Sequence, residues 1–318
     1  MLGYFKLQSL LIGGTELINR EVFIGVMFAL LAAVGFSAKA ILVKLAYLDH
    51  VDAITLLALR MMFSVPFFIA VAIWVNGRNS VPLQRQDWVA VLGLGLLGYY
   101  LSSYLDFLGL EHITASLERL ILFLYPTMTV ILSAFIYKRA IGRKVIAAML
   151  LSYAGILLVL KHDISVSQGS VFLGASLVFA SALCYSIYLV GAGHAISRIG
   201  ATRFTAYAMV VACVASLLQF GVTHSLSVLE LPMRVYWLSL AMAIFSTVLP
   251  VFLLSYAIRR IGSGSSSLIG SIGPVATIAL AYVFLNEAVS GLQIAGTILV
   301  LAGVLMISLN SNKVQAKS

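Results

Sequence analysis

Long apolar runs alternate with short polar breaks along the chain. Each run holds roughly 20 residues, which is the length of α-helix that crosses the hydrocarbon core of a bilayer. The breaks carry most of the charged residues and the turn-forming residues, and they are too short to hold a soluble domain. The pattern predicts ten membrane-spanning helices, at residues 22–43, 54–75, 88–108, 114–137, 145–160, 170–191, 204–222, 235–257, 265–285 and 291–309.

The composition supports a membrane protein. Hydrophobic residues make up 62% of the chain and charged residues only 10%, whereas an average soluble domain carries about 25% charged residues. The opening residues, "MLGYFKLQSLLIGGTELINRE", lack the basic start, long apolar core and small-residue cleavage site of a removable signal peptide. We therefore expect an all-α integral membrane protein whose first span serves as the insertion signal.

The basic residues indicate an orientation in the membrane. A net charge of +9 does not indicate a nucleic-acid partner here, because the Lys and Arg residues are scattered over short loops instead of forming one patch. If the N-terminus is cytoplasmic, most of the 20 basic residues fall on the cytoplasmic side, as the positive-inside rule requires. We expect both termini in the cytoplasm and the chain in a bacterial inner membrane, with its oligomeric state left open.

The second half of the chain repeats the first. A constant shift places Pro126 on Pro274 and Gly155 on Gly303, and it aligns "LYPTMTVILSAFIYKRAIGRKVIAAMLLSYAG" with "IGPVATIALAYVFLNEAVSGLQIAGTILVLAG" without a gap. Each half is then a unit of five spans, the first at residues 1–160 and the second at 161–318. Because five is an odd number, the two units must cross the membrane in opposite directions, which makes them an inverted repeat.

The loop charges differ between the halves as inversion requires. Arg259 and Arg260 align with Glu111 and His112, so the basic pair is lost where the repeat lies on the other side of the membrane. A second loop shows the same loss, since Lys138, Arg139, Arg143 and Lys144 align with Asn286, Glu287, Gly291 and Leu292. Inverted repeats place a site at their interface that opens to each side in turn, so this pattern favours a transporter.

At this point the chain resembles the EamA family of the drug/metabolite transporter superfamily. The resemblance covers nearly the whole chain. It rests on the ten spans arranged as two five-helix repeats, on Arg60 in "LLALRMMF", on the prolines of spans four and nine, and on the ending "LNEAVSGLQIAGTILVLAGVLM". It implies a secondary carrier for small metabolites, often amino acids, with a central cavity lined by both repeats. The first repeat departs from the family pattern, because it has "YKRAIGRK" where an acidic residue is common.

Four charged residues are embedded in spans of the first repeat. A helix rises about 1.5 Å per residue, and this rise places Lys39, Arg60, Asp106 and Glu118 in the outer half of the membrane. An arginine in hydrocarbon costs at least about 2.5–3.5 kcal/mol, so Arg60 should face a partner or a wet cavity. It either binds substrate or forms a structural ion pair. For Lys39 the favoured interpretation is an ammonium that extends to the lipid headgroups.

Glu118 and Arg119 are neighbours in "ASLERLILFLYPT". On a helix they point about 100° apart, so each needs its own partner or water. One interpretation places both in a cavity, and it is favoured because the aligned residues of span nine, Ser266 and Ser267, are also polar. The other leaves both charges at the interface, since residues 120–137 alone are long enough to span.

Span three carries a second group of candidate binding residues in "GYYLSSYLDF". Tyr99, Ser103 and Asp106 share one helix face, and Tyr100, Ser103 and Tyr104 share a neighbouring one. They form either one wall of a binding site or an aromatic belt at the outer interface.

The prolines of spans four and nine are expected to kink their helices. A kink would free backbone carbonyls that could line a cavity, although it could equally reflect packing alone. The small residues of "IGSGSSSLIGSIGP" in span nine indicate close helix packing.

No enzyme motif stands out. "DHVD" occurs once and without basic partners, the five histidines form no zinc-binding pair, and neither a Walker motif nor a nucleophile elbow is present. We therefore expect no catalytic residue, cofactor or metal. The sequence predicts a secondary-active exporter of a small polar metabolite such as an amino acid, with a coupling proton as a further candidate partner. The alternatives are a membrane enzyme acting on a lipid-linked substrate and a non-transporting membrane subunit.

The candidate substrate-binding residues are the polar side chains of spans two, three and four. Arg60 or Arg119 would hold a carboxylate, and Glu118 would hold an amine or the coupling proton. The full set is Arg60, Tyr99, Ser103, Tyr104, Glu118 and Arg119.

Overall fold

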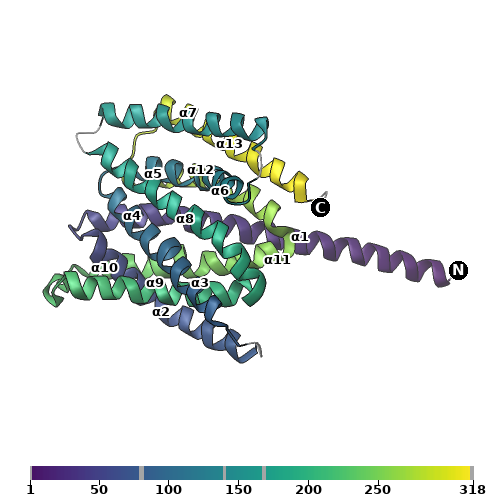
Figure 1. Cartoon of the computed structure of the whole chain (residues 1–318). Helices are drawn as coiled ribbons and strands as arrows, with labels where there is room; N and C mark the ends of the chain where they lie inside the picture. Colours follow the sequence, from purple (N-terminus) through teal and green to yellow (C-terminus); the bar gives the residue numbers. More distant parts are fainter. Residues whose placement is uncertain (1, 79–81, 139–140, 167–169, 316–318) are drawn as a thin grey trace.

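The computed structural model describes residues 2–78, 82–138, 141–166 and 170–315, and within them all regular secondary structure is helical. Arg139, one of the aligned basic residues, lies outside the described residues. The helices form a bundle from which the first part of α1 projects (Figure 1). The helices are α1 Leu2–Tyr47, α2 Ala53–Arg78, α3 Arg85–Gly95, α4 Ser102–Leu110, α5 Ala115–Leu122, α6 Tyr125–Ile136, α7 Arg143–Val166, α8 Val171–Ile199, α9 Ala201–Thr223, α10 Met233–Ala243, α11 Leu249–Gly270, α12 Gly273–Leu285 and α13 Gly291–Gln315.

Within the described residues, nine helical stretches are long and apolar enough to cross a membrane, and the shorter apolar stretch Gly291–Ile307 lies in α13. They coincide with the predicted spans, and a count of ten is compatible with them. Large apolar side chains such as Phe135 and Val222 are more than four-fifths exposed. In water such a surface would be costly, so the outward faces fit a lipid environment. The prediction of an all-α integral membrane protein is confirmed.

Four spans are interrupted, and the interruptions occupy equivalent places in the two repeats. Span three contains a π-helical segment, η1 Leu96–Leu101, and span eight contains another, η3 Ile244–Val248. Span four breaks into α5 and α6 at Phe123 and Leu124, while span nine breaks before α12 at Ser271 and Ile272. The shift that aligns the prolines also aligns both kinds of interruption.

The breaks confirm the predicted kinks. Pro126 and Pro274 each lie in the first turn of the second half-helix, α6 and α12. A proline is tolerated there because its missing N–H would have no partner inside the helix in any case.

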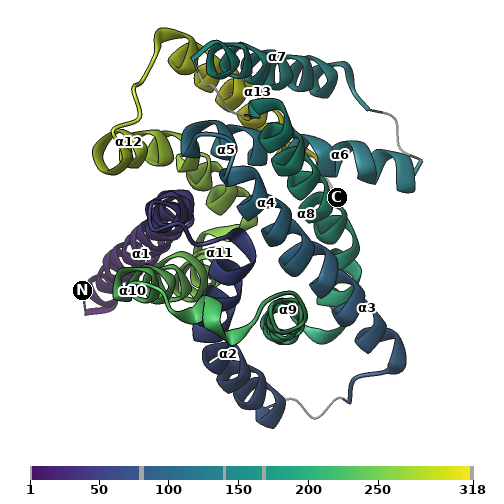
Figure 2. The same cartoon turned by 90° about the vertical axis from the view of Figure 1, so that its left-hand side faces the viewer.

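The packing of helices repeats in the same symmetric way. Helix α7 packs along α13, and α2 packs along α9. Helix α1 packs against α11 and α12, and its counterpart α8 packs against α4 and α6. Figure 2 shows α7 and α13 side by side at one edge, with the remaining spans on one side of that pair. Exchange of the two halves therefore leaves the pattern of neighbours unchanged, as expected for two five-helix repeats.

The α7–α13 pair depends on glycine. A Cβ atom built on Gly155 would lie 2.5 Å from the carbonyl oxygen of Gly296, which is closer than atoms can approach. Small residues of this kind let two helices in a membrane come together backbone to backbone.

Candidate functional site

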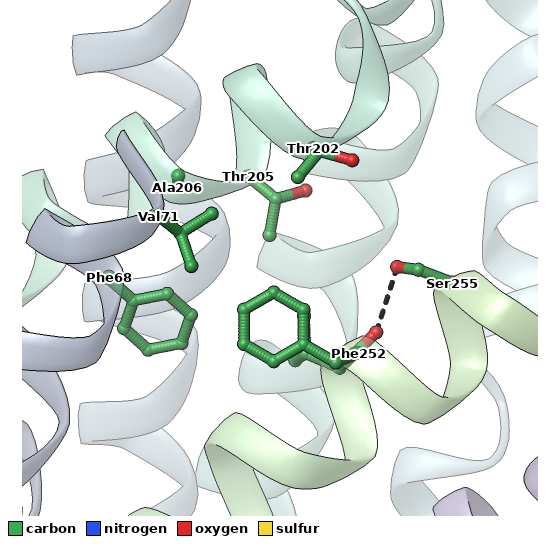
Figure 3. Close-up of a pocket in the computed structure, with 8 residues that line it drawn as sticks. Phe68, Val71, Thr202, Thr205, Ala206, Phe252 and Ser255 are labelled. Carbon is green, nitrogen blue, oxygen red and sulfur yellow. Dashed lines mark hydrogen bonds between the residues drawn. The ribbon is translucent and has the colours of Figure 1, made fainter. Parts of the chain in front are cut away.

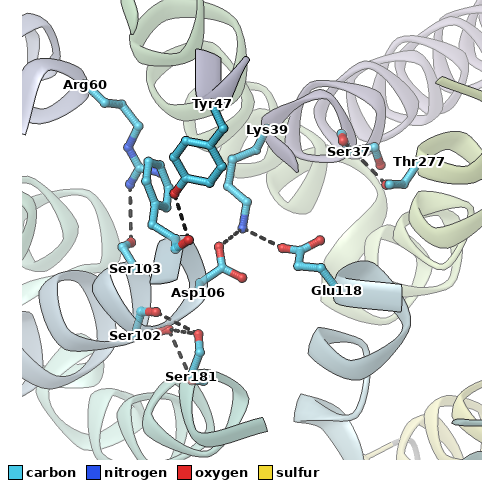
Figure 4. Close-up of polar contacts among 11 residues, drawn as sticks. Ser37, Lys39, Tyr47, Arg60, Ser102, Ser103, Asp106, Glu118, Ser181 and Thr277 are labelled. Atoms are coloured by element: carbon cyan, nitrogen blue, oxygen red, sulfur yellow. Dashed lines mark hydrogen bonds and ion pairs between the residues drawn. The ribbon is translucent and has the colours of Figure 1, made fainter. Parts of the chain in front are cut away.

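Three charged side chains from three spans meet inside the bundle (Figure 4). Lys39 of α1 donates to Asp106 of α4, and its Nζ lies 3.0 Å from Oε1 of Glu118 on α5. The Glu118 side chain is completely buried and Asp106 is only 3% exposed. We call these three residues the charged cluster.

The charged cluster corrects the interpretation that Lys39 extends to the lipid headgroups, and it excludes the interpretation that Glu118 lies at the membrane interface. The ammonium of Lys39 does not extend to the lipid headgroups, because it binds two buried carboxylates and its side chain is only 17% exposed. Glu118 does not lie outside the bundle either, because its side chain has no exposed surface. The cost of burying each charge explains both outcomes, since an ion pair is the way to reduce that cost inside a low-dielectric bundle.

The charged cluster is incompletely satisfied. Within the described residues, Oδ1 of Asp106 and Oε2 of Glu118 are buried and accept no hydrogen bond. One ammonium therefore serves two carboxylates.

Arg60 reaches the same region from α2. Its Nη2 donates to the hydroxyl of Ser103 at 3.3 Å, and its guanidinium carbon lies 5.0 Å from the centre of the Phe107 ring. No carboxylate of the described residues lies within ion-pair distance of Arg60, although Asp106 is close enough to interact with it electrostatically. The hydroxyl of Ser103 and the ring face of Phe107 thus hold the Arg60 guanidinium. Among the described residues it does not form the structural ion pair that was one of the two expectations.

Arg119 lies at the broken part of span nine. A Cβ built on Gly273 would come within 2.6 Å of its Nη2, so the guanidinium rests against the glycine that begins α12. Its Nε is buried without a hydrogen-bond partner, and within the described residues its guanidinium forms neither an ion pair nor a hydrogen bond. Among the described residues, Arg119 is thus a partly buried cation with no carboxylate in ion-pair contact, although Glu118 is close enough to interact with it electrostatically.

Tyrosines from three spans gather beside Arg119. Tyr99 and Tyr188 share a hydrogen bond of 2.8 Å between their hydroxyls, and Tyr188 stacks on Tyr185 with ring centres 5.6 Å apart. Tyr125 meets Tyr185 edge to face, and both interact electrostatically with Arg119. We call Tyr99, Tyr125, Tyr185 and Tyr188 the tyrosine cluster.

The predicted site residues therefore fall into three places. Arg60, Ser103 and Glu118 lie in or beside the charged cluster, and Tyr99 and Arg119 lie at the tyrosine cluster. Tyr104 instead stacks on Tyr100 and packs against the apolar core.

Tyr125, Tyr185 and Tyr188 were not predicted as site residues. The one available signal is that all three stand inside apolar spans, where a phenol hydroxyl needs a partner inside the bundle.

A small pocket opens among α2, α9 and α11 (Figure 3). Phe68, Thr205 and Phe252 are among its lining residues, and Ser255 donates to the carbonyl of Val251 at 2.8 Å. Thr205 also lies within hydrogen-bonding reach of Tyr99. The pocket therefore adjoins the tyrosine cluster, on the side where α9 begins.

Comparison with known proteins identifies the family. Residues 23–161 and 172–309 each match the EamA-like transporter family. The chain belongs to this family. The resemblance seen in the sequence is confirmed, and the chain is a member of a family of multi-pass membrane transporters.

Relatives of this EamA-like protein are named as transporters. It is 30% identical to Uncharacterized transporter YcbK of Bacillus subtilis (strain 168), over 87% of this chain and 90% of the relative. It is 25% identical to a Probable amino-acid metabolite efflux pump of Salmonella typhimurium (strain LT2), over 87% of this chain and 92% of the relative. One solved structure matches 91% of this chain and 98% of its own with a TM-score of 0.64, and at 20% identity it shows a shared fold alone.

Proposed function

We propose that this EamA-like protein is a secondary-active exporter of a small polar metabolite such as an amino acid, working by alternating access without any catalytic step. Family membership supports the transporter class. The relative named as an amino-acid metabolite efflux pump supports both the substrate class and the direction. The chain would lie in a bacterial inner membrane with both termini in the cytoplasm, and its repeat boundary would fall near residue 160.

The observation that carries the substrate class is the unpaired guanidinium of Arg119. A partly buried cation without a counter-ion is suited to a carboxylate, which can accept two parallel hydrogen bonds from one guanidinium. The tyrosine cluster supplies hydroxyls and aromatic faces beside it. Arg60 is a weaker candidate for the carboxylate, because it already donates to Ser103 and lies over Phe107. Arg60 and Ser103 would instead shape the outer side of the site.

The arrangement of polar groups supports access from the cytoplasmic side. With the predicted orientation, the pocket at Thr205 lies in the cytoplasmic half, and Thr205 adjoins Tyr99. From Tyr99 the tyrosine cluster leads to Arg119, and the charged cluster lies beyond it. Helix breaks in spans four and nine would then let the half-helices α5 and α12 move relative to their continuations, as alternating access requires.

Transport by purified protein in lipid vesicles tests this proposal. We expect the wild-type protein to move radiolabelled amino acids and to prefer each amino acid over the amine that lacks its carboxyl group. Arg119→Gln should remove that preference and lower transport at least about tenfold, because ~1.4 kcal/mol of binding free energy corresponds to a factor of ten. Arg259→Gln is the matched control, since Arg259 is exposed outside the site.

Two results would contradict the proposal. Release of a chemically altered product without movement of substrate would favour a membrane enzyme. Wild-type vesicles that build no gradient with any amino acid tested would favour a non-transporting subunit.

A further inference from the structure

The charged cluster holds more negative than positive charge. Asp106 and Glu118 contribute two carboxylates, and Lys39 is the single cation in direct contact with them among the described residues. Two carboxylates that share one buried site cannot both ionise without a large electrostatic cost, so such pairs commonly share a proton.

The surroundings of Glu118 offer no second donor among the described residues. Arg60 of α2 donates to Ser103, Lys44 of α1 donates to the carbonyl of Leu110, and Asp163 of α7 accepts from Thr114. Helix α12 brings Gly273 and Thr277, and Thr277 donates to the carbonyl of Ser37. Three further titratable or charged groups lie near this region. Tyr47 of α1 donates to the carbonyl of Phe107, and Glu287, which follows α12, accepts from the Ala115 N–H. Arg119 of α5 lies at the tyrosine cluster and interacts electrostatically with Glu118.

Two carboxylate oxygens in the charged cluster lack a donor. Oδ1 of Asp106 and Oε2 of Glu118 are both buried without a hydrogen bond among the described residues. Glu118 lies within hydrogen-bonding reach of Asp106, so a proton on Glu118 could be donated to Asp106, and one carboxylate would then remain for one ammonium. The ammonium position beside Glu118 is already occupied by Lys39 at 3.0 Å, so a substrate amine has no place there in this conformation.

We propose that Glu118 is a proton-binding residue, with Asp106 as the neighbouring acceptor and Lys39 as the fixed counter-ion, and that the proton taken up there is exchanged for the exported substrate. The second half of this inference rests on the proposed function. Lys39 links α1 to α4 and α5 through its contacts with Asp106 and Glu118. When one proton is bound, one carboxylate and one ammonium remain, so the charged cluster has no net charge and holds these spans together. Loss of the proton leaves two carboxylates on one ammonium, with Arg60 and Arg119 acting on them only at longer range. The second carboxylate then needs water, which favours opening on the outer side.

Infrared spectroscopy of the purified full-length protein tests proton binding without any substrate. We expect the wild-type spectrum to contain the carbonyl stretch of a buried protonated carboxyl group, which disappears as the pH is raised. Glu118→Gln or Asp106→Asn should remove this band, and Glu118→Asp should retain it at a shifted position. Glu230→Gln is the matched control, because Glu230 is exposed. A wild-type spectrum without a titrating carboxyl band overturns the proposal, even if a variant fails to fold.

Vesicle transport tests the exchange. For a radiolabelled amino acid that the wild-type protein moves, we expect a pH gradient to drive net transport and an internal pH dye to report protons moving the opposite way. Glu118→Gln should lower the ratio of gradient-driven transport to exchange of labelled for unlabelled amino acid at equal pH at least tenfold. Glu230→Gln, which changes an exposed residue outside the site, should leave that ratio unchanged. Wild-type transport that ignores the pH gradient overturns the coupling. A titrating band in a protein that moves no amino acid supports the proton site while the proposed function fails.

Discussion

Lys39 is the residue on which the two buried carboxylates of the charged cluster depend. It contacts Asp106 and Glu118 on two other spans, and Glu118 is completely buried. Removal of one partner from a buried ion pair is more harmful than removal of both, because the remaining charge keeps its desolvation cost. The protein should therefore tolerate paired neutral substitutions in the charged cluster better than single ones.

We expect Lys39→Met to lower the free energy of unfolding by about 3–5 kcal/mol, the range typical of a broken buried ion pair. Combining Lys39→Met with Asp106→Asn should recover part of that loss. Thermal unfolding of the detergent-solubilised protein measures both variants. Equal stability of the single variant and the wild type would mean that water, not Lys39, compensates the carboxylates.

Gly273 controls the position of Arg119. The added Cβ of Gly273→Ala would collide with Nη2 at 2.6 Å, but this atom is the end of a flexible side chain that can move away. We expect stability within about 1 kcal/mol of the wild type, since Ala also favours a helix, and a raised KM for the amino acid in vesicle transport. Gly270→Ala is the control, because a Cβ there meets no atom within 4 Å. An unchanged KM would place the carboxylate elsewhere.

The sequence revealed part of the site for a physical reason. The depth of a residue follows from its distance to the span end, so Lys39, Arg60, Asp106 and Glu118 could be expected at a similar level of the bundle, as the structure places them. Which of them touch could not, because contact depends on how each helix is rotated, and spans with apolar residues on all sides give no rotational signal. Lys39 was misassigned to the headgroups because a long side chain near a span end satisfies that interpretation equally well.

At the scale of elements, the short helix α5 is the most constrained part of the site. It carries Glu118 and Arg119, and its first turn is bound by a residue of the other repeat. Oε1 of Glu287 accepts from the Ala115 N–H at 2.9 Å, and Oε2 accepts from the Ser116 hydroxyl at 2.8 Å. A carboxylate at a helix N-terminus satisfies free N–H groups and interacts favourably with the helix dipole.

Glu287→Ala should loosen the start of α5. We expect a stability loss of about 0.5–2 kcal/mol, as for other lost caps, and faster hydrogen exchange at the amides of Ala115 and Ser116. The amide of Leu117 should change less, because it donates to Thr114 Oγ1. Mass spectrometry of exchanged peptides measures this, with Glu230→Ala as the control. Unchanged exchange at both amides would show that Glu287 is not needed to hold α5.

At the scale of the whole molecule, the repeat was the most predictable property of the fold. Pro126 and Pro274 occupy equivalent helix starts, and the gapless alignment of the two halves agrees with the observed exchange of neighbours. The π-helical segments in spans three and eight were not predicted, because one extra residue in a helical turn leaves the local apolar pattern almost unchanged.

The predicted orientation remains to be measured. We expect a reporter fused after Ser318 and a single-cysteine label at Lys138 to be accessible from the cytoplasm, and a label at His50 to be accessible from outside. The reason is the excess of basic residues on the cytoplasmic side. Labelling with a membrane-impermeant thiol reagent, in a background lacking Cys184 and Cys213, distinguishes the two sides. The reverse accessibility would invert the assignment of the outer half.

The two π-helical segments extend the inverted repeat to the backbone itself. Under the shift that places Pro126 on Pro274, Leu96 falls on Ile244, so both segments begin at the same aligned position. A widened turn weakens the regular hydrogen bonding of a helix and is frequent at functional sites. Each repeat therefore carries a point of local backbone weakness in its third span, and the inversion presents one such point toward each side of the membrane.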